Sequence, residues 1–489
     1  MKRTKPVYTL IQNDLLKALI IVTIVFMVIL VIQQRGDPMK TIAWLLVVVF
    51  LPLFGIALYF FFGKNYRKEK IFSRKGLTDS KQIKLLAKYQ PGEKPDKNYL
   101  PDETITAKAH IMKMLYNSDK VLLTACNRVK ILVNGKVTFE HIIAELEKAK
   151  DHIHLEYYII DDDHIGNEVR NILIRKAKEG LEVRVIYDDV GCWSLSDKFI
   201  RSLKNAGVRI FPFMPVRFPF LTSRINYRNH RKIIVIDGKV GFVGGLNIAD
   251  RYISGSEELG PWRDTHLKIE GEAVYSLQSV FLLDWYFASK RNLYDQDRFF
   301  PPVEVADRHL MQIVTSGPDS DWASIMQTFF SAIATAKSYI YISTPYFLPN
   351  ESILTAIRTA SLSGVDVRML LPEQGDAKLV HWSSFSYVSQ LLDVGVKVYL
   401  YRKGFTHSKL MMVDDAFCSI GTANMDIRSF DQNFEVNALI YDHRITIAMR
   451  NIFMNDIKDL KHININDWNE RPRWVVFRES VARLFSPLL

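Results

Sequence analysis

The chain is poor in cysteine: Cys126, Cys192 and Cys418 are its only three in 489 residues, and none lies in a CxxC or Cys/His cluster. This excludes a disulfide framework and a cysteine zinc site, and it indicates a reducing compartment. No carboxylate cluster that would hold a metal ion is evident either. Charged residues make up 24% and hydrophobic residues 48%. That balance excludes a disordered tail protein, a fibrous protein and a small secreted scaffold.

Positive charge is in excess, with 64 Lys+Arg against 53 Asp+Glu and a net charge of +11. Such a balance suits an anionic partner: nucleic acid, an acidic membrane surface or a phosphorylated substrate. At about 100–200 residues per domain, the length predicts two to four domains.

Two long apolar runs lie near the N-terminus, at residues 15–32 and 41–62. Because a helix of about 20 residues crosses the hydrocarbon core, they predict a membrane anchor over residues 1–64 with two transmembrane helices. Lys17 near the start of the first run would have to reach back to the interface. A cleaved signal peptide is the alternative for the first run, but no small-residue cleavage site follows it. A buried helical hairpin in a soluble domain is the other alternative.

Basic residues flank the two runs: Lys2, Arg3 and Lys5 precede the first, and residues 64–88 carry nine Lys/Arg against Glu69 and Asp79. The positive-inside rule therefore predicts that both ends and the whole catalytic body lie on the cytoplasmic side of the cell membrane. We expect residues 65–110 to form a basic juxtamembrane linker. Its charge either attracts anionic lipid headgroups or belongs to a solvated linker, and the two interpretations are compatible.

The remainder reads as a duplicated α/β unit. Residues 152–159 and 339–343 form strand-like runs, and each is followed by a helix-like run that ends at glycine, Gly180 or Gly364, and then by another strand. This alternation predicts two α/β/α domains, over residues 111–300 and 301–489, each with a parallel sheet and crossover helices. Asn134-Gly135 predicts a hairpin within residues 128–140. Val481, Leu484, Phe485 and Leu488 predict a small apolar helical face, docked on the body rather than inserted in lipid.

Each half carries the same constellation of polar residues, with identical spacings. The first copy is His230, Lys232, Asp237, Gly244 and Asn247, and the second is His407, Lys409, Asp414, Gly421 and Asn424. One H-x-K-x4-D motif is weak, but two in matching places of a duplicated unit are far less easily accidental.

The chemistry of these residues suits a phosphodiester. Residues i and i+2 of a strand share a face, so each histidine points the same way as its lysine. If a pseudo-twofold axis brings the two strands together, one site holds two imidazoles and two ammonium groups, with amides from Asn247 and Asn424. The lysines would neutralise phosphate oxygens in place of a metal ion. One histidine can attack phosphorus while the other transfers protons. For Asp237 and Asp414, hydrogen bonding at a turn is the simpler interpretation.

The doubled motif resembles the phospholipase D superfamily. The N-terminal runs, with Trp44-Leu45-Leu46, Leu51-Pro52 and Phe62-Gly63-Lys64-Asn65, resemble the membrane anchor of bacterial cardiolipin synthases. Three later stretches resemble the same enzymes: residues 316–319, 344–347 and 484–489.

The resemblance implies transfer of a phosphatidyl group from one phosphatidylglycerol to another, giving cardiolipin and glycerol without a nucleotide or required metal cofactor. It implies two domains that form one active site, His230 as nucleophile, His407 as acid and base, and Lys232, Lys409, Asp237 and Asp414 as further catalytic motif residues. It also implies that carboxylates about thirty residues beyond each motif, Asp264 and Glu435, orient the histidines. Many relatives have Gly-Ser where this chain has Gly244-Gly245 and Gly421-Thr422, so only Thr422 keeps a hydroxyl for phosphate binding.

Three other functions compete with this interpretation. A membrane-anchored phospholipase D would use the same steps but release phosphatidic acid to water. A nuclease of the superfamily would fit the positive charge, but two membrane spans and the lack of a stacking platform argue against it. An inactive lipid-binding scaffold would not need two intact His/Lys pairs.

Overall fold

A computed structural model describes residues 102–216, 223–293 and 297–486, together with Leu100 and parts of the N-terminal region: 21–29, 32–33, 38–51, 54–55 and Tyr59. The chain divides into two units, and each is described by itself. One comprises residues 1–73 and 217–225, and the other comprises residues 74–216 and 226–489.

In the N-terminal unit, residues 21–29 are helical and α2 spans Pro38–Phe50. Met27, Val48 and Tyr59 form a small buried cluster, and the Trp44 ring meets the Tyr59 ring edge-on at 5.4 Å. None of the helices within the described residues is both long and apolar enough to cross a bilayer. The predicted spans at 15–32 and 41–62 lie partly outside those residues, as does residue range 65–99 of the predicted linker.

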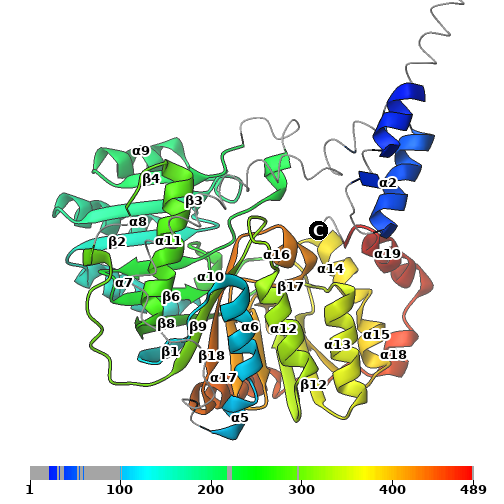
Figure 1. Cartoon of the computed structure of the whole chain (residues 1–489). Coiled ribbons are helices and arrows are strands. Elements are labelled where there is room, and N and C mark those ends of the chain that lie inside the picture. Colours follow the sequence, from blue (N-terminus) through cyan, green and yellow to red (C-terminus); the bar gives the residue numbers. More distant parts are fainter. Residues whose placement is uncertain are drawn as a thin grey trace, which may run out of the picture. The chain divides into compact units, whose positions relative to one another are not determined.

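The larger unit contains two seven-stranded sheets with the same topology (Figure 1). The strand order of the first sheet is β1-β8-β6-β5-β2-β3-β4, and the matching order of the second is β9-β18-β16-β15-β10-β12-β13. The strands of the first sheet are β1 (Asn127–Val133), β2 (His152–Tyr157), β3 (Glu182–Asp188), β4 (Arg209–Phe213), β5 (Ile233–Ile236), β6 (Val240–Gly244) and β8 (Thr265–Gly271). Those of the second are β9 (Leu310–Ser316), β10 (Tyr339–Ser343), β12 (Asp366–Pro372), β13 (Lys397–Tyr401), β15 (Leu410–Val413), β16 (Phe417–Gly421) and β18 (Glu435–Tyr441). The predicted duplication of an α/β unit is confirmed.

The sheets are mixed rather than parallel throughout. Only β2-β3-β4 and β10-β12-β13 pair in parallel, and the other neighbours in each sheet are antiparallel. The crossover helices predicted from the sequence join only those parallel strands. Short hairpins such as β5–β6 and β15–β16 make the antiparallel part, which carries the motifs.

Helices cover both sheets and bury apolar cores on both faces. The helices of the first half are α7 (Asn134–Lys148), α8 (His164–Lys178), α9 (Asp197–Asn205), α10 (Arg251–Ser254) and α11 (Ala273–Ser289), with the short turn η6 (Asp297–Phe299). The short turn η5 (Ser223–Asn226) belongs mostly to the N-terminal unit. Those packed with the second half are α5 (Glu103–Thr106), α6 (Ala109–Asp119), α12 (Ser324–Ala334), α13 (Glu351–Leu362), α14 (Lys378–Phe385), α15 (Val388–Leu392), α16 (Ile427–Asp431), α17 (His443–Ile457), α18 (Ile465–Asn469) and α19 (Arg473–Arg483). As predicted, α8 and α13 end at Gly180 and Gly364, whose φ angles of 97° and 90° favour glycine.

One cluster of buried side chains joins the two halves, because it takes residues from both sheets and from α11 and α17. A second cluster lies under α7, α8 and α9 of the first half. The third fills the second half and includes Ile111, Met112 and Leu115 of α6, although α6 precedes the first sheet in the chain. The segment before the first sheet is thus packed into the second half.

The hairpin predicted around Asn134-Gly135 is wrong. Strand β1 pairs with β8, far along the chain, and α7 begins at Asn134 itself. Asn134 takes a φ of 66°, and its amide donates to the Asp264 carbonyl at 2.9 Å. Gly135 approaches the Tyr252 carbonyl so closely that a Cβ would lie 2.0 Å from the oxygen. The dipeptide therefore serves a tight turn from strand to helix under α10.

The predicted docking of the C-terminal apolar face is also wrong. Helix α19 packs beside α14 through Glu479 and Ala482, which are buried. Val481, Leu484 and Phe485 are exposed instead, and Leu488 lies outside the described residues.

Candidate active site

The two motif histidines precede equivalent central strands, His230 before β5 and His407 before β15. Both are more than nine-tenths buried. The Lys232 Nζ donates to the His230 carbonyl at 2.7 Å, and the Lys409 Nζ donates to the His407 carbonyl at 2.6 Å. The expectation that each lysine shares a face with its histidine is therefore met in both halves.

Backbone hydrogen bonds join the two halves directly beside the histidines. Strand β7 (Trp262–Arg263) pairs in parallel with β14 (Phe405–Thr406), and the His407 amide donates to the Arg263 carbonyl at 2.8 Å. The matching contact on the other side has the His230 amide donating to the Phe434 carbonyl at 2.9 Å. Each histidine is therefore anchored by backbone of the opposite half.

These backbone contacts bring a carboxylate to each histidine, and the carboxylates are exchanged between the halves. The Nδ1 atom of His230 lies 2.9 Å from Glu435 Oε2, and that of His407 lies 2.7 Å from Asp264 Oδ2. Glu435 and Asp264 are fully buried. A neutral imidazole that donates from Nδ1 carries its lone pair on Nε2. The arrangement thus prepares both Nε2 atoms to take a phosphoryl group or a proton.

Burial and positive neighbours keep both imidazoles neutral. Burial lowers the pKa of His230 to about 4, although the Glu435 carboxylate opposes the shift. Burial likewise lowers the pKa of His407 well below its ordinary value, with Lys409 and Lys232 adding to the effect. Neutral imidazole is the form that can act as a nucleophile.

The two lysines are held in the same buried environment. Burial lowers the pKa of Lys409 to about 8, against the opposing effect of Asp264. Burial lowers the pKa of Lys232 well below its usual range, against Glu435. A phosphate group entering this site would bring negative charge and raise the pKa of both ammonium groups and both imidazoles.

The carboxylates differ in their surroundings. The Thr422 hydroxyl donates to Glu435, and Asn433 lies within hydrogen-bond reach of the same carboxylate at 3.4 Å. Burial raises the pKa of Glu435, but His230, Lys232 and Thr422 outweigh it and the net shift is downward. Gly245 stands where the second half has Thr422, and a Cβ there would lie 2.3 Å from Asp264 Oδ1. The glycine therefore makes room for the Asp264 carboxylate.

Asp264 receives less support from hydrogen bonds. Its Oδ1 accepts the Thr265 amide at 2.7 Å. Burial raises the pKa of Asp264 to about 6, even though Lys409 and the Thr265 amide lower it. Of the two orienting carboxylates, only this one titrates near neutral pH.

The two asparagines occupy equivalent positions but have different partners. Asn247 accepts the Ile159 amide at 3.2 Å and donates from Nδ2 to the Tyr252 hydroxyl at 2.5 Å. The Asn424 side-chain oxygen has no hydrogen-bond partner within the described residues, although it is buried. Asn247 is thus committed to its own half, whereas the Asn424 side chain hydrogen-bonds Asp426 and leaves only its oxygen, an acceptor, to contact a ligand hydroxyl.

The motif aspartates do not reach the histidines. Asp237 follows β5 and accepts the backbone amides of Lys150, Asp151 and His152 at 2.8–2.9 Å. Asp414 follows β15 and accepts the amides of residues 337–339, together with the Lys108 Nζ at 2.9 Å. Both have φ near 54°, the left-handed conformation of a tight turn. The turn interpretation describes their environment, and a direct catalytic role has no contact to support it.

Sequence reasoning missed the aromatic rings that flank the histidines. The Tyr158 ring centroid lies 4.9 Å from that of His230, and Lys232 Nζ lies 5.2 Å from the centroid of the same tyrosine. On the other side, Tyr252 and Trp262 each lie 5.5 Å from His407. Tyr158 lies just beyond β2 and Trp262 lies two residues before Asp264, but no spacing rule distinguishes these aromatics from core residues.

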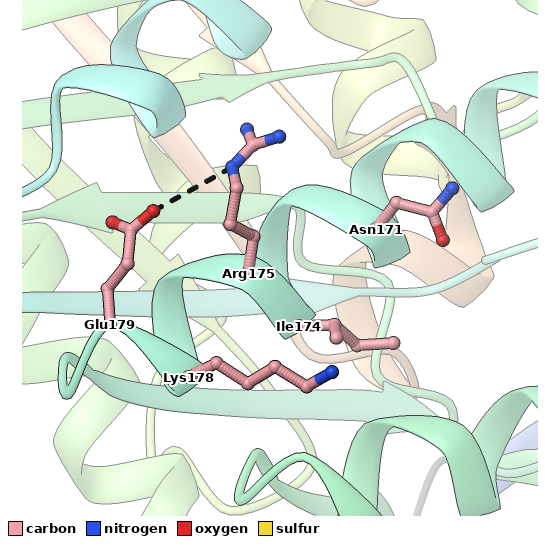
Figure 2. A pocket seen from close by; sticks show the side chains of 5 residues that line it. All are labelled: Asn171, Ile174, Arg175, Lys178 and Glu179. Atoms are coloured by element: carbon pink, nitrogen blue, oxygen red, sulfur yellow. Dashed lines mark ion pairs between the residues drawn. The ribbon is translucent and has the colours of Figure 1, made fainter.

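A surface hollow on α8 is separate from this site (Figure 2). It is lined by Asn171, Ile174, Arg175, Lys178 and Glu179, with an ion pair of 3.8 Å between Arg175 and Glu179. The four polar side chains are exposed and Ile174 is partly buried, all at one helix end without a nucleophile or a buried polar group, and they suggest no chemistry. Across the part of the chain that the structure describes, no three His, Cys, Asp or Glu residues gather as metal ligands.

Comparisons with known proteins agree with this geometry. A family model described as "Cardiolipin synthase, PLD-like domain" matches residues 142–285 and 329–457, and one described as "Phospholipase_D-nuclease N-terminal" matches residues 18–64. A solved phosphatidylserine synthase of Haemophilus influenzae has a TM-score of 0.61 at 17% identity, covering 78% of this chain and 100% of its own. The fold and the paired motifs are those of the phospholipase D superfamily.

Full-length relatives give the narrower assignment. The cardiolipin synthase of Geobacillus sp. (strain WCH70) is 44% identical over 475 residues, which cover 97% of this chain and 94% of the relative. That of Listeria monocytogenes serotype 4b (strain CLIP80459) is 40% identical, covering 97% of this chain and 99% of its own. The chain belongs to the cardiolipin synthase family.

Proposed function

We propose that this protein is a cardiolipin synthase that transfers a phosphatidyl group from one phosphatidylglycerol to the free glycerol hydroxyl of another, releasing glycerol. The full-length relatives with that name and the two neutral, carboxylate-oriented imidazoles support the proposal. Phospholipids are the substrate class and the enzyme is membrane-associated. The charge pattern at the N-terminus favours an integral anchor in the cell membrane, with the catalytic body on the cytoplasmic side.

In the first step, His230 Nε2 attacks the phosphorus of the donor lipid. The bond from phosphorus to the headgroup glycerol oxygen breaks, and His407 delivers a proton to that oxygen. Glycerol leaves, and the phosphatidyl group is held on His230 as a phosphohistidine. Glu435 acts on His230 as a positioning residue, because its bond to Nδ1 directs the Nε2 lone pair outward.

In the second step, His407 takes the proton from the free hydroxyl of a second phosphatidylglycerol. The hydroxyl oxygen attacks phosphorus, the P–N bond breaks, and cardiolipin leaves with His230 restored. Asp264 positions His407 as Glu435 positions His230. His407 must carry a proton before the first step, and the negative charge of the bound phosphate favours that protonation.

The two lysines neutralise the phosphate oxygens as charge accumulates in the transition state. The Asn424 oxygen, which lacks a partner among the described residues, can accept a hydrogen bond from a substrate hydroxyl but cannot contact the phosphate oxygens, which are acceptors too. Asn247 and Thr422 act indirectly: Asn247 donates to the Tyr252 hydroxyl, and Thr422 donates to the Glu435 carboxylate. The single observation that carries the mechanism is the exchange of Glu435 and Asp264 between the halves, because it builds one site from both motifs.

The decisive experiment uses the purified protein in membranes whose only phospholipid is phosphatidylglycerol, with a chelator present, and identifies products by mass. We expect cardiolipin and equimolar glycerol. Phosphatidic acid with glycerol would instead make the protein a hydrolase in practice, with the same first step. Loss of activity that one specific metal restores would contradict the proposed role of the lysines. The His230→Ala variant, prepared in the same way, is the matched control for contaminating activity.

A further inference from the structure

Helix α19 turns its apolar side away from the second half, on which it packs. Trp474, Phe477 and Leu484 are 63%, 70% and 78% exposed, and Val481 between them is also exposed. Their spacing of three, four and three residues places them along one face of the helix. We call these four residues the α19 stripe. Single exposed apolar side chains are ordinary, but a continuous stripe of large ones marks an interaction surface.

The inner side of the same helix buries a charged side chain. Glu479 is buried and pairs with Arg471 at 2.8 Å, and its neighbour Ala482 is buried too. Just past the helix, the Ser486 hydroxyl lies 2.7 Å from that of Ser383 on α14. A surface helix ordinarily buries its apolar side and exposes its charges. Because α19 reverses this pattern, its apolar side must serve something other than the core.

Positive charge borders the stripe. Helix α19 carries Arg473, Arg478 and Arg483 against one acid, Glu479, which is turned inward; Arg473 is exposed, whereas Arg483 lies over the Tyr387 ring at 4.2 Å. Arg478 lies over the rings of Trp474 at 5.0 Å and Trp382 at 4.3 Å, so its cation sits at the base of the stripe. The helix lies at the edge of the second half beside α14, whose residue Lys378 is also exposed (Figure 1).

We propose that the α19 stripe docks on an anionic lipid surface, with its rings and Leu484 in the boundary between headgroups and acyl chains. Charge complementarity selects this occupant, because Arg473, Arg478 and Lys378 beside an apolar stripe match anionic headgroups above acyl chains. Tryptophan is enriched at the same depth in membrane proteins. The contact goes beyond the proposed reaction and does not depend on it, since it concerns how the catalytic body is held at the bilayer.

The test places a nitroxide label on the full chain in vesicles of phosphatidylglycerol and phosphatidylcholine. Cys126 is replaced by serine, since Cys192 and Cys418 are buried, and single cysteines are introduced as Phe477→Cys or Leu484→Cys. Leu362→Cys at the end of α13 is the matched control, because Leu362 is 72% exposed on another helix. A His230→Ala background keeps the lipid composition constant. Collision with oxygen reports hydrocarbon, and collision with a water-soluble nickel chelate reports solvent.

We expect labels at positions 477 and 484 to favour oxygen and the label at 362 to favour nickel. Replacing phosphatidylglycerol by phosphatidylcholine alone should make positions 477 and 484 shallower. Nickel access at 477 and 484 equal to that at 362 would overturn the proposal. Labels shielded from both reagents would also overturn it and would indicate a protein contact; dipolar broadening between labels would then identify a second copy of this chain.

A second measurement compares the activity of Phe477 variants on vesicles and in detergent micelles. Phe477→Asp should lower lipid conversion on vesicles about five- to tenfold while leaving conversion in detergent micelles unchanged, because micelles carry substrate to the enzyme without a flat surface. Phe477→Leu is the matched control and should retain most of the vesicle activity. An equal loss of activity in vesicles and in micelles would contradict docking of the α19 stripe. If the unaltered chain transfers no phosphatidyl group in either system, the proposed reaction is refuted, and the docking proposal is then judged by the nitroxide labels.

Discussion

The pairs His230–Glu435 and His407–Asp264 occupy equivalent places in two halves of one topology, yet their electrostatics differ. Glu435 accepts the Thr422 hydroxyl and has a lowered pKa, with burial opposing the shift. Asp264 abuts Gly245, and burial raises its pKa to about 6. The two halves therefore place these groups at equivalent positions, whereas the pKa values of the two carboxylates are shifted in opposite directions.

The difference suits a division of labour. In the proposed mechanism, an ionised Glu435 would hold His230 in one tautomer, as a nucleophile requires. Asp264, whose pKa is raised to about 6, would make the charge beside His407 more sensitive to pH near neutrality. The following predictions test whether the two pairs really differ in role, from the largest expected effect to the smallest.

Removing either imidazole is the most severe change. We expect His230→Ala and His407→Ala each to lower kcat by on the order of 10⁴-fold or more, because the two groups act as a unit. Mass spectrometry of quenched enzyme should find the phosphatidyl adduct on the peptide that contains His230. An adduct on His407 would reverse the assignment, and substantial turnover in either variant would refute the two-histidine mechanism.

The exchanged carboxylates should matter nearly as much. We expect Glu435→Gln and Asp264→Asn each to lower kcat by about 10²- to 10⁴-fold, because the histidine loses its preferred tautomer. KM should change little, and this split separates positioning from substrate binding. Pre-steady-state kinetics should show slower adduct formation for Glu435→Gln. Unchanged kinetics in both variants would mean that the carboxylates serve only packing.

The motif aspartates should affect stability rather than chemistry. Asp414 pairs with Lys108, which is almost fully buried, whereas Asp237 binds only backbone amides. Asp414→Asn should lower the free energy of unfolding by about 3 kcal/mol, because it leaves a buried ammonium unpaired. Asp237→Asn should cost about 1–2 kcal/mol through weakened hydrogen bonds. Urea unfolding measures both, and a loss of kcat in fully folded variants would restore a catalytic role.

The pH profile tests the electrostatic difference directly. We expect kcat/KM to fall below about pH 6, where Asp264 becomes protonated, and to fall again at alkaline pH, at or below about pH 8, where the buried lysines lose their charge. Each limb should approach about tenfold per pH unit. The double variant Lys232→Arg/Lys409→Arg should move the alkaline limb upward, because arginine stays charged. An alkaline limb that does not move in this variant would assign it to another group.

The smallest expected effect concerns the Thr422 hydroxyl, which supports Glu435 and has no counterpart beside Asp264. Thr422→Val removes the bond to Glu435 and should lower kcat about fivefold, the value of a single hydrogen bond. Thr422→Ser, which keeps the hydroxyl, is the matched control and should retain activity. No side chain can be added at Gly245, the equivalent position in the first half, because the Cβ of Gly245→Ala would clash with the Asp264 carboxylate. Equal activity of the valine and serine variants would remove Thr422 from the positioning network.

Much of the fold was predictable because its signals are local. Apolar runs defined β2, β3, β10 and β12, and Gly180 and Gly364 ended the helices between them. The hairpin prediction failed because Asn134-Gly135 has the same turn preference before a helix as between two strands. Strand β1 pairs with β8, which lies more than a hundred residues further along the chain, and no local sequence signal identifies this partner. The antiparallel pairing in the centre of each sheet likewise could not be predicted from the local alternation of strands and helices.

The sequence by itself determined the duplicated unit and the two His/Lys pairs, since these depend on spacing along one chain, and its resemblance to the phospholipase D superfamily supplied the two candidate carboxylates. Only the tertiary structure decided that Glu435, 28 residues after His407, serves His230, and that Asp264 serves His407. The physical reason is that a histidine and its carboxylate meet through the docking of two halves, where backbone pairing across the interface brings together residues that spacing leaves apart. The outward stripe of α19 has the same origin, because periodicity identifies an apolar face but packing alone decides which way it turns.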